Sequence, residues 1–402
     1  MTRSIFSSPQ IDRRGEDEEN PADAAPHDSI MELIFLKLPI KSLVRFKSVC
    51  KHWLSLISHS PFVQSYLKHL LSIEKIITFI PSSSEFYVLN LDKGNNNITI
   101  VQHHKYSLPL SVEAPDLVRL MGSCNGLICL GIYPIFTGSQ PIVPFSPILW
   151  NPLLNDYKKV PFLIPIYIHW FGFGYDSHTQ DYKFVRIDIT EAVTQIYGLK
   201  SNSMRVFPFE YELFGIGPGC GGLYNPMGVY MNGSLYWLHS TSSLEFGFIV
   251  FNLRYEKCRF LKFPNHINIP FRNAGFSTIV RDSQLDVFFY KPQDRFFTLV
   301  TMIGNKVNGT ISWSSINIQN PNLGILEYLP ECVMMNGDIV MDIKYDDFPS
   351  RNSYHRIIYN PKRSTFECIS TIHEGAEDLE AEYTTYIETL ISPSNLINCS
   401  AP

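Results

Sequence analysis

Three stretches of this chain repeat one layout, in which an Asn-Gly pair ends one apolar run and opens the next. The pairs are Asn125-Gly126, Asn232-Gly233 and Asn336-Gly337. After each pair come an apolar strand, a gap, a second apolar strand and a last short strand. Asn-Gly favours a type I′ hairpin turn, because both central residues of that turn need a positive φ. The layout therefore predicts an antiparallel hairpin at the same place in each repeat.

The spacing of the pairs indicates how many strands lie between them. They are 107 residues apart from 125 to 232 and 104 apart from 232 to 336. Propeller blades run about 40 to 50 residues, so each interval holds two blades. Strand patterns at 76–91 begin the ring, and a late strand at 386–392 is expected to pair with the first blade. We predict an all-β propeller of six blades, with a pair of β-sandwiches as the alternative because the blade lengths are irregular.

The segment 26–62 differs from the rest of the chain because its apolar residues follow helical spacing. Ser29 and Glu32 fit a capping box, Pro39 ends one helix or opens the next, and a third helix ends before Pro61. Three short helices cannot bury two apolar faces and a Trp in a core of their own. Either the rest of the chain or another protein must cover the excess.

The order of residues in this segment resembles the F-box, in the form common in plants. The matching runs are Pro26-x-Asp28, then Leu38-Pro39-x-Lys41-Ser42-Leu43-x-Arg45-Phe46, then Val49-Cys50-Lys51-x-Trp53. Ala25 stands where that family usually has Leu, which removes one apolar contact. The resemblance implies a three-helix domain that binds a Skp1-type adaptor and, through it, a cullin-RING ubiquitin ligase.

The resemblance also implies which residues bind the adaptor. The predicted contact residues are Pro26, Ile30, Leu33, Ile34, Leu38, Pro39, Leu43, Phe46, Val49, Cys50, Trp53 and Ile57.

The β-rich body is similar to the F-box-associated region of plant F-box proteins. The similar segments are 122–130, 149–152, 171–176, 182–185, 232–238 and 386–392. In that family the region resembles kelch-type propellers and presents the substrate. The implied function is the substrate-recognition subunit of an SCF ubiquitin ligase, with an unidentified protein as substrate. The alternative is a propeller-type ligand-binding or scaffold protein that acts outside a ubiquitin ligase.

Composition and charge limit the kinds of partner and the cellular compartment that we expect. The formal net charge of −5 does not favour nucleic acid, which usually calls for a basic face. We expect no signal peptide and no membrane partner, since no apolar run approaches the roughly 18 residues of a membrane helix. The eight cysteines contain no C-x-x-C pair and are expected to be reduced and mostly buried. These features predict a cytoplasmic or nuclear protein, or one found in both compartments.

Catalytic patterns are absent or lack the structural context they need. Residues 217–222 satisfy G-x-G-x-x-G, but the following Leu-Tyr-Asn-Pro cannot open the helix that a dinucleotide site requires. His103, His104 and His169 have no carboxylate or Cys neighbours at metal-ligand spacing. We therefore predict no catalytic residue, no metal, no cofactor and a non-enzymatic adaptor.

The predicted organisation is α+β and multidomain. A disordered leader at 1–24 precedes the three-helix F-box domain at 25–70, and the propeller-like domain at 74–392 precedes a tail at 393–402. The acidic stretch at 374–382 is expected to be a solvated loop.

Overall fold

The structure is a computed structural model that divides the chain into two compact units, Met1–His69 and Leu70–Pro402. The described residues are 21–70, 75–80, 85–94, 97–107, 116–134, 146–161, 169–189, 191–210, 227–241, 245–267, 275–281, 284–290, 296–304, 311–319, 325–333, 338–345, 353–360, 362–363, 365–370 and 382–397. Residues 1–20 of the predicted leader, the Asn336-Gly337 pair, the G-x-G-x-x-G stretch and nearly all of the acidic stretch lie outside them.

The first unit contains four helices where the sequence predicted three. They are α1 (Pro21–Phe35), α2 (Ile40–Phe46), α3 (Lys51–Ser58) and α4 (Ser60–Leu70). The third helix does end before Pro61, but Pro61 lies in the first turn of α4, where its missing N–H costs nothing. Helix α1 begins at Pro21, ahead of the predicted cap, so residues 21–24 are helical and do not belong to a disordered leader.

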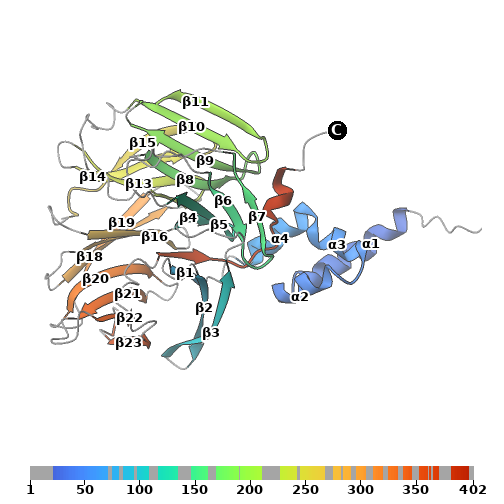
Figure 1. The fold of residues 1–402 in the computed structure, drawn as a ribbon, viewed down its shortest axis with the longest axis horizontal. Helices are drawn as coiled ribbons and strands as arrows, with labels where there is room; N and C mark the ends of the chain where they lie inside the picture. The colour runs from blue at the N-terminus through green and yellow to red at the C-terminus, as the bar shows by residue number, and fades with distance from the viewer. Residues whose placement is uncertain are drawn as a thin grey trace, which may run out of the picture. The chain divides into compact units, whose positions relative to one another are not determined.

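The described strands of the second unit form five sheets, in which every pairing but one is antiparallel (Figure 1). The first sheet contains β24 (Glu382–Tyr386), β1 (Lys75–Ile80), β2 (Glu85–Gly94) and β3 (Asn97–Ser107). The next contains β4 (Asp116–Cys124), β5 (Leu127–Pro134), β6 (Ile148–Asn151) and β7 (Asp156–Lys159). Two others contain β16 (Gly275–Arg281), β17 (Gln284–Tyr290), β18 (Phe296–Gly304) and β19 (Ile311–Gln319), and β20 (Ile325–Val333), β21 (Ile339–Tyr345), β22 (Ser353–Asn360) and β23 (Thr365–Ser370).

The remaining sheet has eight strands, made of two runs of four. One run contains β8 (His169–Asp176), β9 (Asp181–Asp188), β10 (Val193–Gly198) and β11 (Ser203–Pro208). The other contains β12 (Met227–Met231), β13 (Ser234–Ser240), β14 (Phe246–Asn252) and β15 (Lys257–Lys262). A short parallel pairing of β8 with β12 joins the two runs, so both run in the same direction. Since two runs share one sheet, the number of blades stays a prediction.

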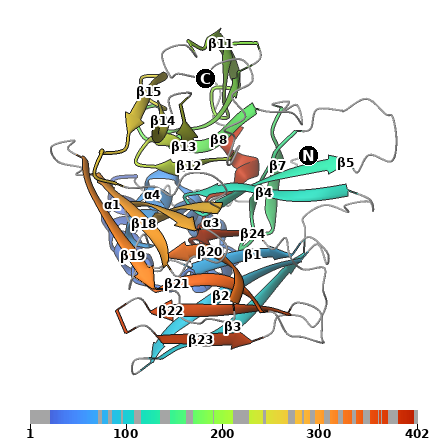
Figure 2. The same ribbon diagram turned by 90° about the vertical axis from the view of Figure 1, so that its left-hand side faces the viewer.

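The first strands of successive runs contact one another in a closed circle. Strand β24 contacts β4, β4 contacts β8, β8 contacts β12, β12 contacts β16, β16 contacts β20, and β20 contacts β24 (Figure 2). A closed circle of inner strands belongs to a propeller, whereas a pair of stacked sheets has none. The propeller-like fold is therefore confirmed, and the β-sandwich alternative is wrong.

The C-terminal strand closes this circle, as the sequence predicted, but with different residues. Strand β24 pairs antiparallel with β1 from Lys75↔Tyr386 to Phe79↔Glu382. The predicted closing strand at 386–392 thus begins where the real strand ends. Residues after Tyr386 instead lead into a 3-10 helix, η2 (Pro393–Ile397), which lies against β6 and β7.

The Asn-Gly turns adopt the predicted backbone. The φ angles are 52° and 77° at Asn125 and Gly126, and 49° and 77° at Asn232 and Gly233. Both turns join the first and second strands of their runs, β4 to β5 and β12 to β13.

The apolar cores lie between neighbouring four-stranded runs, where large aromatic residues pack. Trp150 packs edge-on against Phe86 at 4.9 Å between ring centroids and joins the core that contains Ile77 and Tyr386. Trp170 stacks on Trp237 at 6.4 Å in the next core along.

Candidate functional site

The helical unit has a small aromatic core. Phe35 is 1% exposed and lies 5.2 Å from Trp53 and 6.4 Å from Phe62, between ring centroids. Tyr66 of α4 donates a 2.7 Å hydrogen bond to the backbone carbonyl of Leu38, which fixes the connection between α1 and α2. The fourth helix, absent from the prediction, thus supplies part of the core that holds the other three together.

Five large apolar side chains of this unit remain on its surface. They are Ile30 (57% exposed), Leu33 (61%), Ile34 (48%), Val49 (61%) and Leu54 (45%), and we call them the exposed apolar surface. They come from α1, from α3 and from the connection before α3. These two helices contact each other, and His52 Nε2 lies 2.9 Å from Asp28 Oδ1 across them. Apolar surface of this kind in a small unit marks an interaction site.

The structure sorts the predicted adaptor-binding residues into three groups by exposure. The exposed members are Ile30, Leu33, Ile34, Pro39, Val49 and Cys50, and the half-buried ones are Leu38, Phe46 and Trp53. Leu43 and Ile57 are 0% exposed and belong to the core of the unit, so their contact with an adaptor stays a prediction. The side chain of Pro26 lies outside the described residues.

One exposed apolar residue was missed by the sequence prediction. Leu54 follows Trp53 directly on α3 and is not among the predicted contact residues. Its neighbour turns toward Phe35, so Leu54 points elsewhere on a helix this short.

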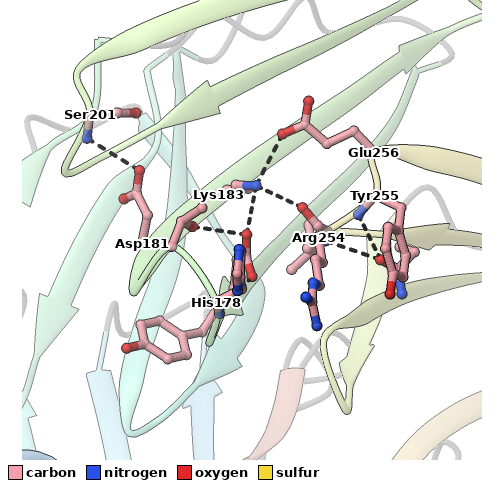
Figure 3. Close-up of polar contacts among 12 residues, drawn as sticks. His178, Asp181, Lys183, Ser201, Arg254, Tyr255 and Glu256 are labelled. Carbon is pink, nitrogen blue, oxygen red and sulfur yellow. Dashed lines mark hydrogen bonds and ion pairs between the residues drawn. The ribbon is translucent and has the colours of Figure 1, made fainter.

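A second notable site lies between β8–β11 and β12–β15, where a lysine is buried. Lys183 has a side chain only 4% exposed, and its Nζ donates to Asp176 Oδ2 at 2.9 Å, to the Leu253 carbonyl at 2.7 Å and to Glu256 Oε1 at 3.0 Å (Figure 3). Glu256 also accepts from Arg205 of β11. A buried ammonium is tolerated only when its donors are satisfied, and here three acceptors do so.

The electrostatics of Asp176 fit this arrangement. Burial alone would raise its pKa, but the Lys183 ammonium and the hydrogen bonds from Lys183, His178 N and Thr179 Oγ1 outweigh burial and lower it. The carboxylate therefore stays charged, and the network ties the β8–β9 turn to the β14–β15 turn.

Chemically reactive groups are few among the described residues. No three His, Cys, Asp or Glu side chains there are grouped to hold a metal ion. Cys124 and Cys129 are buried free thiols whose pKa is raised by burial, and burial raises the pKa of Cys258 to about 12. Cys50 is an exposed free thiol. Among all the residues that the structure describes, no helix combines the length and apolar character needed to cross a bilayer.

Family models match both units of the chain. Residues 26–65 match the F-box domain, and residues 77–374 match the F-box associated beta propeller domain. The second match covers more than half of the chain.

Curated relatives of this chain are named as F-box proteins. An F-box/kelch-repeat protein of Arabidopsis thaliana is 27% identical over 274 residues, which cover 62% of this chain and 69% of that protein. An F-box/WD-40 repeat-containing protein of the same plant is 26% identical over 230 residues, covering 52% of this chain and 48% of that protein. The chain thus spans between about half and seven tenths of the length of these two relatives.

Solved structures resemble the chain only distantly. The crystal structure of TolB from Acinetobacter baumannii aligns with a TM-score of 0.42 at 9% identity. The alignment covers 80% of this chain and 70% of the TolB chain. A likeness this weak supports no argument about function. The sequence runs, the helical unit, the closed ring of strands and the two family matches agree with one another, and the chain belongs to the plant F-box proteins that carry an F-box associated β-propeller domain.

Proposed function

We propose that this chain is the substrate-recognition subunit of an SCF-type ubiquitin ligase. Its helical unit binds a Skp1-type adaptor, and its β unit binds the protein to be ubiquitinated. The observation that carries the proposal is the exposed apolar surface, located in the unit that matches the F-box domain.

Physical chemistry supports a protein partner for this surface. Burying one Leu, Ile or Val side chain contributes about 1.5–3 kcal/mol, so five such residues give an adaptor enough apolar area for stable binding. Among them, Leu33 and Val49 are the most exposed. A small helical unit alone cannot recover this free energy by folding.

In this role the chain catalyses nothing. It holds the target near the ligase, so that ubiquitin transfer occurs at a high effective concentration. Members of the family are typically non-catalytic adaptors, and we place this one in the cytoplasm, the nucleus or both. A scaffold that acts outside a ubiquitin ligase is the competing function.

The test is adaptor binding by the full chain and by the L33D/V49D variant. We expect the wild-type chain to co-purify with a Skp1-type adaptor, and the double variant to bind at least about 100-fold more weakly because two apolar contacts become buried charges. The I316D variant is the matched control, since Ile316 of β19 is 51% exposed but lies in the β unit. Helix content measured by circular dichroism should be equal in all three proteins.

Two results would contradict the proposal. One is a wild-type chain that does not bind any Skp1-type adaptor, which favours the scaffold. The other is an L33D/V49D variant that retains full affinity, which removes the exposed apolar surface from the interface.

A further inference from the structure

Charged side chains are distributed unevenly over three neighbouring turns of the β unit. These turns are the β8–β9 turn, the β10–β11 turn with the start of β11, and the β14–β15 turn. Strands β8 and β12 are parallel, and all other neighbours in this sheet are antiparallel, so β8, β10 and β14 run in the same direction. The three turns follow these strands and therefore lie at the same end of the sheet. Asp, Glu, His, Lys and Arg side chains occur within residues 176–181, 198–205 and 252–257. All of those that are exposed are basic: His178, Arg205, Arg254 and Lys257.

The acidic side chains of the same turns face inward and already have donors. Asp181 is buried and accepts hydrogen bonds from Lys200 N at 2.6 Å and Ser201 N at 3.2 Å. Asp176 is buried against Lys183, and Glu256 has a side chain 17% exposed that contacts both Lys183 and Arg205. The carboxylates of these turns are thus paired within the β unit, and the basic side chains remain on its surface.

The β14–β15 turn adds an aromatic ring to this positive surface. Tyr255 is 66% exposed, and the guanidinium carbon of Arg254 lies 5.4 Å from the centre of its ring. Neither Arg254 nor Lys257 forms an ion pair with any residue that the structure describes. Figure 3 shows Arg254, Tyr255 and Glu256 on one turn beside Lys183. We call Arg205, Arg254, Tyr255 and Lys257 the basic turn surface.

The backbone that carries this surface is fixed from two sides. Asn252 Oδ1 accepts from Arg254 N at 3.1 Å and from Tyr255 N at 2.9 Å, and Lys183 holds the carbonyl of Leu253. A turn that is already rigid loses less conformational entropy when a ligand binds. The buried network therefore orders the turn and leaves its cations available.

We propose that the basic turn surface binds an acidic segment of the target protein. The proposal rests on the function proposed above, which makes a protein the ligand of the β unit. Carboxylates complement the exposed cations, and Tyr255 supplies apolar contact area beside them. Nucleic acid is a less suitable ligand, since the net charge of the chain is −5 and the basic turn surface has only three arginine or lysine side chains.

The test uses the full chain in complex with its Skp1-type adaptor and a fluorescein-labelled peptide of alternating Glu and Ser. A peptide with Gln in place of Glu is the ligand control, and binding is measured by fluorescence anisotropy at low and high salt. We expect the Glu peptide to bind more tightly than the Gln peptide, with a preference that falls as salt rises. We expect R254E/K257E to weaken Glu-peptide binding about tenfold.

A matched variant separates the surface from net charge. K362E/R363E reverses two exposed cations on the equivalent turn between β22 and β23, and it should leave peptide affinity within about twofold. The milder R254Q/K257Q serves if the reversed charges disturb folding, which thermal melting reports. Adaptor binding by R254E/K257E should equal that of the wild type, so failure here is distinguishable from failure of the proposed function.

Three results would overturn the proposal. They are equal affinity for the Glu and Gln peptides, equal weakening by the two charge-reversal variants, and tighter binding of a single-stranded DNA homopolymer than of the Glu peptide. Absence of Glu-peptide binding at low salt counts as the first of these.

Discussion

The β4–β7 and β12–β15 runs share one sequence layout, and each has an asparagine at the end of its third strand. The two asparagines bind different partners. Asn252, the last residue of β14, donates its side-chain amide to Ser234 Oγ at 3.3 Å, within its own run. Asn151, the last residue of β6, donates to the carbonyls of Thr389 and Ile391 at 2.9 and 2.7 Å. One asparagine closes its own hairpins, and the other holds the C-terminal segment of the chain.

The residue after each Asn-Gly pair explains the difference. It is Ser234 in the second repeat and Asp338 in the third, and each accepts from the asparagine of its own run, Asn360 donating to Asp338 Oδ1 at 2.7 Å. In the first repeat it is Leu127, which has no side-chain acceptor. Asn151 is therefore available to bind the segment that follows β24. The apolar Leu127 in place of a polar residue thus coincides with a different partner for Asn151, the segment after the ring-closing strand β24.

The largest predicted effect compares the glycines of the two Asn-Gly turns. Both have φ of 77°, but a Cβ at Gly126 would collide with the Ile387 carbonyl oxygen and the Thr389 side chain, whereas one at Gly233 meets nothing within 4 Å. We expect G126A to lower the free energy of unfolding by about 3–4 kcal/mol, from backbone strain plus overpacking, and G233A by about 1–2 kcal/mol from strain alone. Urea unfolding of both variants measures the two values. Equal losses would show that the C-terminal segment does not pack on Gly126.

The next effect compares the two asparagines. N151A removes two buried hydrogen bonds to backbone carbonyls as well as the turn bonds to Leu153 N and Leu154 N, and we expect a loss of about 3 kcal/mol. N252A removes one weak side-chain bond and the two turn bonds, and we expect about 1 kcal/mol. Hydrogen exchange should accelerate at residues 389–397 in N151A only. Protection retained there in N151A would contradict the role assigned to Asn151.

The smallest effect concerns a histidine that the first repeat lacks. His239 lies seven residues after Asn232, at the position of Ile132 in the first repeat, and it is 2% exposed beside Trp170. Neither ring nitrogen hydrogen-bonds to a residue that the structure describes, and burial lowers the pKa of His239 to about 4. The unfolded state therefore binds the proton more readily between pH 6.5 and 4, so stability falls as the pH falls through that window.

We expect His239 to remove about 2 kcal/mol of stability between pH 7 and pH 5. The H239I variant, which introduces the residue of the first repeat, should lose that part of the pH dependence. Urea unfolding at both pH values measures it, with H178A as the control because His178 is exposed. A wild-type chain and an H239I variant with parallel pH profiles would show that His239 is not buried in its neutral form.

Local patterns in the sequence were sufficient for much of the fold. Asn125-Gly126 and Asn232-Gly233 predicted hairpins because the positive φ that they favour is a property of the residues themselves. The resemblance to the F-box identified the helical unit, and six of its predicted contact residues are exposed. Burial of Leu43 and Ile57 in the core was not foreseen, because an apolar residue on a short helix is compatible with a core and with an interface alike.

Long-range partners could not be predicted in the same way. Lys183 reads as an ordinary polar strand residue, and only the approach of Leu253 and Glu256 from another run makes it a buried ion-pair partner. The closing strand was predicted a few residues too late, because the apolar run after Tyr386 packs without joining a sheet. Pairing of β24 depends on β1, which lies near the other end of the chain.

The sequence alone determined the elements whose energetics are local: the hairpin turns, the alternation of strands and the apolar excess of the helical unit. The tertiary structure decided which C-terminal residues close the ring, where Asn151 donates, and which charges of the β14–β15 turn remain outside. The reason is physical. A turn is stabilised by the backbone preference of two adjacent residues, whereas a buried amide or ammonium is stabilised only by acceptors that folding brings to it.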